Sequence, residues 1–191
     1  MKKKIILFAS GNGSNVENIC RYFKKNQDIE VSGVYTNNPR AYLIQRLVPF
    51  DVKVEVFGRL AFRNGKLLEK IKSKKPDLII LAGFLWKIGI DWLKAFPMNI
   101  INIHPALLPL YGGKGMYGYR VHQEVKKNDE KETGITIHYV NEAYDKGQII
   151  FQAKVNIDDK DTPDIIASKV QSLEYANFPK VIQSLLYKDS H

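Results

Sequence analysis

The side chains of this sequence best suited to chemistry are an amide and an imidazole two positions apart, Asn102 and His104. They follow the apolar run 98–101, which predicts a short buried strand. Residues two apart on a strand point to the same face, so both side chains project together where the strand ends. Pro105 cannot donate to a sheet ladder, so regular pairing should stop there. Because ligands of open α/β sheets bind at the carboxyl ends of strands, the pair predicts a binding site; a polar strand end leading into a stiff loop is the alternative.

A carboxylate and a second histidine later in the chain could complete such a site. Asp145 lies in a turn between two expected strands, and His138 lies near the end of the first of them. Beside His104, Asp145 would hold the imidazole charged and oriented. Because these groups include no Ser or Cys nucleophile, they suit polarisation of a carbonyl and proton transfer during direct attack by an amine. Asp145 could equally be an ordinary turn residue, and His138 a supporting or purely structural group.

The glycine-rich segment 10–15, Ser-Gly-Asn-Gly-Ser-Asn, joins the first expected strand to the first helix. Its glycines let the backbone approach a ligand, and the helix start presents free N–H groups to an anion. Ser14 or Asn15 could cap this helix or bind phosphate oxygens. Val16 replaces the third glycine of a dinucleotide fingerprint, and no acidic residue ends the second strand. The turn therefore predicts a site for a single phosphate, with a plain glycine turn as the alternative.

The composition fits one globular domain over residues 1–191. The chain is 45% hydrophobic and 26% charged, which is ordinary for such a domain. Its net charge of +9 comes largely from lysine clusters, which we interpret as solvated faces that also attract anionic ligands. Cys20, the single cysteine, excludes an intrachain disulfide and is expected to be a buried, inert thiol. His122 and His191 lack a chemical context and are expected on the surface.

No apolar run reaches the length of a membrane span, and no signal peptide is recognisable at the start. We therefore expect a cytoplasmic protein with no membrane partner. No recognition motif accompanies the basic charge, so no nucleic-acid partner is expected either.

Strands and helices alternate along the chain. Strands are expected over 4–9, 31–36, 52–57, 78–82, 98–102, 134–140 and 148–155. Helices are expected over 15–25, 40–47, 64–74, 91–96, 119–127 and 162–186, the last kinked or split by Pro179. This order predicts an α/β fold with a mostly parallel twisted sheet, helices on both faces and antiparallel late strands. The loop 105–118, rich in glycine, is a candidate mobile lid.

These segments together resemble the formyltransferase family over essentially the whole chain. The resemblance rests on the blocks 10–15, 81–84, 102–109 and 138–147, with Gln171 and Glu174 in the last helix. It implies a Rossmann-like formyltransferase fold. It also implies transfer of a formyl group from 10-formyltetrahydrofolate to the amine of glycinamide ribonucleotide in purine biosynthesis. The folate is a cosubstrate, and neither a tightly bound cofactor nor a metal is expected.

The resemblance also implies roles for individual residues. Asn102, His104 and Asp145 form the catalytic trio: the first two stabilise the oxyanion, with His104 protonated, and Asp145 moves a proton through a water. The residues implied to hold the ribonucleotide are Gly11, Asn12, Gly13, Ser14, Asn15, Gln171 and Glu174. Those implied to line the folate pocket are Arg63, Leu85, Trp86, Lys87, Ile88, Asn102, Asn141, Glu142 and Tyr144. Arg59 and Arg63 flank the place of the family's folate arginine, and Lys87 stands where an arginine is common.

Other functions must be weighed against glycinamide ribonucleotide formylation. A member that formylates tRNA would need a further C-terminal domain, and one that releases formate from the folate would carry an N-terminal regulatory domain. A non-catalytic basic module for phosphorylated ligands or nucleic acid is the alternative outside the family. We expect a monomer or homodimer acting on small molecules.

Overall fold

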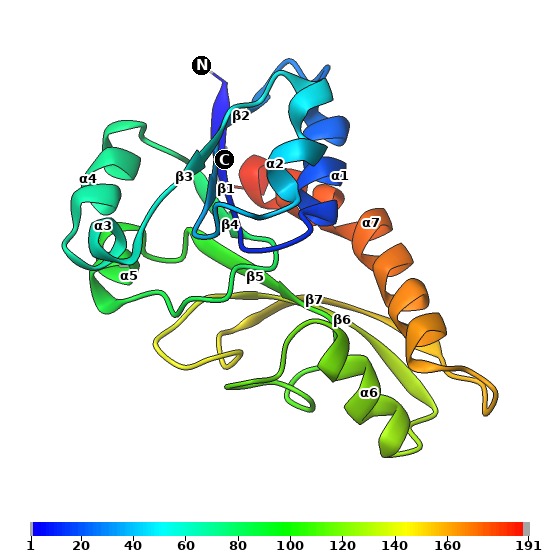
Figure 1. Ribbon diagram of the computed structural model, residues 1–191. Coiled ribbons are helices and arrows are strands. Elements are labelled where there is room, and N and C mark those ends of the chain that lie inside the picture. The colour runs from blue at the N-terminus through cyan, green and yellow to red at the C-terminus, as the bar shows by residue number, and fades with distance from the viewer. Residues whose placement is uncertain (1, 189–191) are drawn as a thin grey trace.

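One mixed sheet organises the chain. The computed structural model describes residues 2–188 and orders seven strands β3-β2-β1-β4-β5-β6-β7 (Figure 1). Neighbours from β3 to β5 pair parallel, whereas β5–β6 and β6–β7 pair antiparallel. The strands are β1 (Lys3–Ala9), β2 (Ile29–Thr36), β3 (Val54–Val56), β4 (Leu78–Leu81), β5 (Ile100–His104), β6 (Glu132–Tyr139) and β7 (Ile149–Asn156). The predicted α/β class, with antiparallel late strands, is confirmed.

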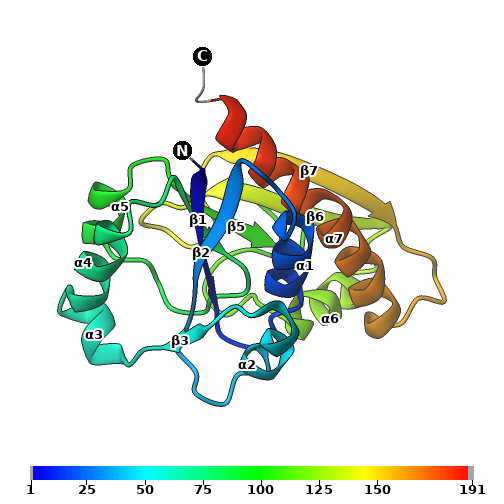
Figure 2. The same cartoon turned by 90° about the horizontal axis from the view of Figure 1, so that it is seen from above.

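Helices cover both faces of this sheet. They are α1 (Ser14–Phe23), α2 (Leu43–Arg46), the 3-10 turn η1 (Val48–Phe50), α3 (Arg59–Arg63), α4 (Lys66–Ser73), α5 (Ile90–Ala95), α6 (Tyr119–Lys127) and α7 (Pro163–Lys188). Figures 1 and 2 show α3, α4 and α5 on one side of the sheet and α1, α2 and α7 on the other. Over residues 2–188, none of these helices combines the length and the apolarity that a membrane crossing demands.

Alternating residues of the central strands supply two cores, one on each face. Ile5 and Leu7 of β1 pack with α1 and α7, whereas Ile6 and Phe8 pack with α3, α4 and α5. All four are completely buried, and full burial of each is worth about 1.5–3 kcal/mol. Cys20 lies in the first core, where burial raises the pKa of its thiol to about 12, in keeping with the predicted inert thiol. Both cores therefore hold β1, the strand that leads into the glycine turn.

Strands β1 and β4 are neighbours, although helices on opposite faces follow them. The chain leaves β1 for α1 on one face and leaves β4 for α5 on the other. Such a reversal opens a crevice at the carboxyl ends of the strands. The segments after β1, β4 and β5 all line a cavity at this crevice.

Three elements differ from the expectations. The helix expected over 40–47 is reduced to α2, and α3 was not expected because five residues give little more than one helical turn. Strand β5 begins at Ile100 because Met98 has a φ of 56°, a left-handed conformation that a strand does not include.

Pro179 was expected to kink or split the last helix; the split does not occur, since α7 runs unbroken through Pro179. A proline has no N–H to donate to the carbonyl one turn earlier, here that of Tyr175. The side-chain amide of Asn18 in α1 donates to this carbonyl at 3.0 Å. The neighbouring helix thus supplies the donor that the proline removes.

Candidate active site

A cavity of about 780 Å³ lies at the carboxyl ends of β1, β4 and β5. Its walls come from the turn 11–15, the segment 81–88, the strand end 102–105, the loop segment 113–119 and one side of α7. The antiparallel strand β6 and the turn after it close the remaining side. Every residue of the expected catalytic trio lines this cavity.

Strand pairing brings the first two polar side chains together. Asn102 of β5 is directly opposite His138 of β6 in the antiparallel register. The Asn102 Nδ2 atom lies 3.2 Å from Nε2 of His138, whose Nδ1 lies 2.8 Å from the carbonyl of Tyr139. Because a carbonyl only accepts, Nδ1 of His138 donates to it. Nε2 then accepts from Asn102 when the ring is neutral, and faces Asp145 as a donor when the ring is protonated.

The turn between β6 and β7 delivers Asp145. Asn141 shapes this turn by donating to the carbonyl of Lys146 and accepting from the N–H of Ala143. Asp145 itself has a φ of 54°, a left-handed backbone that is strained for a residue other than glycine. A Cβ on Gly147 would lie 1.6 Å from the carbonyl oxygen of Tyr139, so only glycine fits there.

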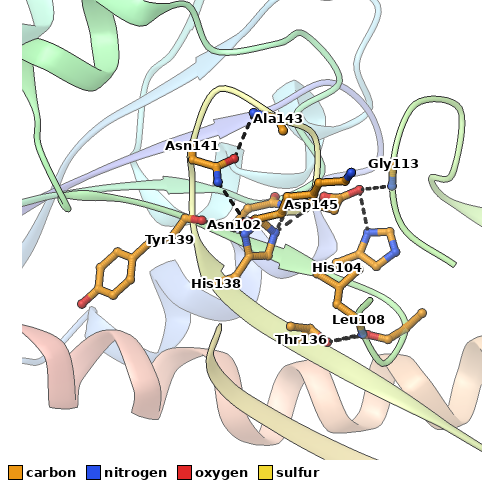
Figure 3. Close-up of polar contacts among 12 residues, drawn as sticks. Asn102, His104, Leu108, Gly113, Thr136, His138, Tyr139, Asn141, Ala143 and Asp145 are labelled. Carbon is orange, nitrogen blue, oxygen red and sulfur yellow. Dashed lines mark hydrogen bonds and ion pairs between the residues drawn. The ribbon is translucent and has the colours of Figure 1, made fainter. Parts of the chain in front are cut away.

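Asp145 is the centre of the polar cluster (Figure 3). Its Oδ2 accepts from the N–H of Gly113 at 2.9 Å and lies 3.6 Å from Nδ1 of His104. Its Oδ1 lies 3.6 Å from Nε2 of His138 and 3.5 Å from the amide of Asn102. Burial raises the pKa of Asp145, but His138, His104 and the Gly113 N–H outweigh it and hold this pKa below its ordinary value. The carboxylate is therefore ionised at neutral pH.

His104 was expected to be a charged imidazole, and the structure gives a different charge state. Its Nε2 donates to the carbonyl of Tyr111 at 2.7 Å, so Nδ1 is the ring nitrogen that faces Asp145. Burial lowers the pKa of His104, and this effect exceeds the opposing influence of Asp145 and of the Tyr111 carbonyl. The ring is only 3% exposed, which explains why loss of hydration dominates. The free protein therefore holds His104 neutral at pH 7.

His122 does not lie on the surface, contrary to expectation. It is 7% exposed, lines the cavity, and has a buried Nδ1 with no hydrogen-bond partner. Burial, and next the proximity of His104, lower its pKa. The spacing of His122 and Val125 on α6, three residues apart on one helical face, is a sequence signal that could have placed it inward. His191 lies outside the described residues.

The glycine turn lies at the other end of the cavity. Gly13, with a φ of 74°, occupies the N-cap position of α1, and no side chain caps the helix. The cap expected from Ser14 or Asn15 is therefore not made. Instead the Asn15 amide donates to Glu174 of α7 at 2.8 Å, and the Gln171 amide lies 3.5 Å from the Ser14 hydroxyl.

Two features of this end matter for binding. Burial raises the pKa of Glu174 to about 7, and the hydrogen bond from Asn15 only partly offsets that effect. The Asn15 Oδ1 atom is buried without a hydrogen-bond partner, so an acceptor is free beside the cavity. The residues expected to hold a ribonucleotide that line this end are Gly11, Asn12, Gly13, Ser14, Asn15, Gln171 and Glu174.

Most residues expected around the folate line the cavity as well. These are Leu85, Trp86, Lys87, Ile88, Asn102, Asn141 and Tyr144. Arg63 and Glu142 are not among the residues that line it. The guanidinium of Arg59 lies over the Trp86 ring, 5.1 Å from its centre, so Arg59 rather than Arg63 is the arginine beside this wall.

Comparison with known proteins agrees with the fold. Residues 3–182 match the family model described as formyl transferase. A phosphoribosylglycinamide formyltransferase from Bacillus subtilis is 36% identical over 190 residues, which cover 96% of this chain and 95% of the relative. A chloroplastic protein of the same name from Arabidopsis thaliana is 34% identical over 193 residues; the match spans 96% of this chain and 65% of the relative's length.

Solved structures are similar to this chain over nearly its whole length. A phosphoribosylglycinamide formyltransferase from Bacillus halodurans has a TM-score of 0.87 and 32% identity, covering 98% of this chain and 97% of that one. The one from Streptococcus pneumoniae has a TM-score of 0.85 and 31% identity, covering 97% of this chain and 99% of that one. The expected family and fold are confirmed. The chain belongs to the formyl transferase family.

Proposed function

We propose that this chain transfers the formyl group of 10-formyltetrahydrofolate to the amine of glycinamide ribonucleotide, a step of purine biosynthesis. The observation that carries the proposal is the convergence of Asn102, His104 and Asp145 on a cavity whose far end is the glycine turn. Relatives similar over nearly the whole of this chain are named for that reaction. We extend the proposal to a single domain acting in the cytoplasm on small molecules, as a monomer or homodimer.

The ribonucleotide would occupy the end formed by the turn 11–15 and α7. Its phosphate would accept from backbone N–H groups at the start of α1 and from Ser14, where the helix dipole favours an anion. Its ribose hydroxyls would reach Glu174 and the unpartnered Oδ1 of Asn15. Each hydroxyl can donate to one oxygen, which satisfies the buried acceptor.

The folate would occupy the end formed by the segment 85–88 and the turn that carries Asp145. Trp86 packs among aromatic rings of the second core, Phe57 and Phe62 included, and gives a stiff apolar wall. Apolar walls with a few polar groups suit a flat aromatic ring system. Asn141 and Tyr144 supply the polar groups on the opposite side.

The chemical step is direct attack of the substrate amine on the formyl carbon. A new C–N bond forms, the carbonyl becomes an oxyanion, and the bond to N10 of the folate then breaks. Asn102 would donate to the oxyanion, because its 3.5 Å contact with Asp145 is at the long limit and leaves an amide hydrogen free. His104 would assist by holding the proton of the attacking amine at Nδ1, received by way of Asp145, while the oxyanion exists, and would return it to Asp145 when the intermediate collapses.

Asp145 would handle the proton that the attacking amine loses. Its carboxylate is ionised at neutral pH, so it can accept this proton, and its lowered pKa lets it release the proton again readily. A water bound to Asp145 would pass that proton to N10, which leaves as a neutral amine. The atoms balance: the nucleophile loses one proton and the leaving group gains one.

A turnover assay with the purified chain tests the proposal. We expect formyl transfer with both substrates present and none when either is omitted. Formate release without an acceptor would favour a hydrolase, and transfer to charged tRNA would favour the tRNA-formylating class. Salt-sensitive binding to nucleic acid without any transfer would favour a non-catalytic basic module.

A further inference from the structure

The short helix α2 packs directly behind the glycine turn. The N–H of Leu43, its first residue, donates to the carbonyl of Gly11 at 3.2 Å. A Cβ placed on Gly13 would lie 2.4 Å from Cδ1 of Leu43, so the turn and the helix are already at their closest approach. Any group of α2 that contacts the turn can therefore influence its shape.

Arg46, the last residue of α2, makes the polar contacts of this interface. Its Nε donates to the backbone carbonyl of Asn12 at 3.0 Å, and its Nη2 donates to the Asn12 side-chain oxygen at 2.8 Å. Its Nη1 pairs with Glu17 in the first turn of α1, and the guanidinium lies over the Tyr42 ring. The side chain is 23% exposed, so these contacts hold it in a single place. The guanidinium makes these contacts from three nitrogens spread across a plane, whereas an ammonium has a single nitrogen to reach all three acceptors.

Asn12 is the residue that most needs such support. It lies between Gly11 and Gly13 and lines the cavity. Glycines on both sides give this segment more backbone freedom than any other sequence would, and a ligand must remove that freedom on binding. Holding both the carbonyl and the side chain of Asn12 orders the segment before the ligand arrives.

We infer that Arg46 is a positioning residue for the phosphate end of the site, fixing the turn through Asn12 without touching the substrate. It is not among the residues that line the cavity, so its influence passes through Asn12. It also balances the carboxylate of Glu17, which would otherwise oppose an anion at the start of α1. The inference rests on the proposed function, because it assigns the turn to the ribonucleotide's phosphate.

Arg21 provides a matched control. It pairs with the same carboxylate, Glu17, but its side chain is 66% exposed, and its hydrogen bond is to Glu17 rather than to Asn12. Arg21→Met therefore removes one arginine from Glu17 and leaves the turn untouched. Arg46→Met removes one arginine from Glu17 and releases Asn12.

Steady-state kinetics on the full chain separate the two variants. We expect Arg46→Met to raise the KM for glycinamide ribonucleotide about tenfold, the size expected when a preordered segment is released. The kcat and the KM for the folate should stay within about twofold, and Arg21→Met should change none of the three constants. Arg46→Lys should recover only part of the loss, because one ammonium cannot hold both oxygens of Asn12.

Calorimetric binding of ribose 5-phosphate gives a readout that does not depend on turnover. Weaker binding by Arg46→Met than by Arg21→Met supports the inference, as does faster exchange of the amide hydrogens of residues 11–15. An unchanged KM and unchanged binding in a folded Arg46→Met protein overturn it. A drop in kcat and in affinity for both substrates would also overturn it, because Arg46 would then serve the whole fold. Failure of the wild-type chain to turn over glycinamide ribonucleotide would instead contradict the proposed function.

Discussion

The two ends of the cavity are held in different ways. At the glycine-turn end, the supporting side chains belong to helices: Asn15 and Glu174 join α1 to α7, and Arg46 of α2 holds Asn12. At the catalytic end, Asp145 and His104 depend on backbone groups of the loop 105–118, the N–H of Gly113 and the carbonyl of Tyr111. The glycine-turn end is therefore held by side chains of packed helices, whereas the charges of the other end depend on the position of the loop 105–118.

The carboxyl groups of the two ends show the same contrast. Two histidines and a backbone N–H hold the pKa of Asp145 below its ordinary value, despite burial. Glu174 accepts a hydrogen bond from the neutral amide of Asn15, and burial raises its pKa to about 7. Environments that separate the pKa values of two carboxyl groups give them different roles. Asp145 suits proton transfer, and Glu174 suits hydrogen bonding to a neutral sugar.

The largest effect should come from the catalytic end. We expect His104→Ala to lower kcat by about 10²–10³, the usual cost of losing one group that stabilises an oxyanion. The KM for the ribonucleotide should change little, because the proposed function places its phosphate at the opposite end. Steady-state kinetics and circular dichroism of the purified variant test both points. A folded His104→Ala protein with near-normal turnover would remove His104 from the mechanism.

Most residues that the sequence predicts for the glycine-turn end lie in the segment 10–15, and Gln171 and Glu174 of α7, which the resemblance implies, line the same end of the cavity. Alternation along a strand likewise predicts that Asn102 and His104 point the same way, and the register agrees, with Asn102 opposite His138 and His104 opposite Thr136. The support from Arg46 could not be predicted, since α2 meets the turn only after β2 returns beside β1. Local pattern thus predicts which residues form the site but not what holds them.

The charge of His104 is the property of the site that the sequence predicts least well. Pairing with Asp145 predicts a raised pKa, but the fold buries the ring so fully that its pKa is lowered instead. The burial of His122 has a similar origin, because α6 turns it toward a cavity that distant segments close. Loss of hydration depends on every segment that surrounds a group, and no short motif encodes it.

The next effect tests the turn end through two glycines of the same segment. A Cβ on Gly13 would meet Leu43 at 2.4 Å, and the φ of 74° adds strain for any other residue. A Cβ on Gly11 would meet nothing within 4 Å. We expect Gly13→Ala to lower the free energy of unfolding by about 2 kcal/mol, with Gly11→Ala close to wild type in stability. Equal losses of stability in thermal unfolding would show that the close packing of α2 is unimportant.

A smaller effect should appear in the pH dependence of binding. Glu174 has a pKa of about 7 in the folded chain against 4.5 ordinarily. Its contribution to the free energy of unfolding is therefore complete below pH 4.5 and is lost as the pH rises through 7. The ionised carboxylate accepts more strongly from ribose hydroxyls, so the KM for the ribonucleotide should fall as the pH rises through about 7. In Glu174→Gln this part of the pH dependence should vanish. The substrate phosphate also titrates near pH 6, but it does so identically with both proteins. An identical pH profile for both would contradict a titrating Glu174.

The smallest effect concerns the contact between α7 and α1 near the glycine turn. Asn18→Ala removes the donor to the Tyr175 carbonyl, which water can then reach, so we expect a loss of about 0.5–1 kcal/mol of stability. Pro179→Ala restores a helical N–H for that carbonyl, and in this background Asn18→Ala should cost less. The helix propensity of residue 18 cancels in the double-mutant cycle, which isolates the coupling between the two positions. Equal losses of stability in both backgrounds would mean that water already donates to the Tyr175 carbonyl. Packing alone would then keep α7 helical at Pro179.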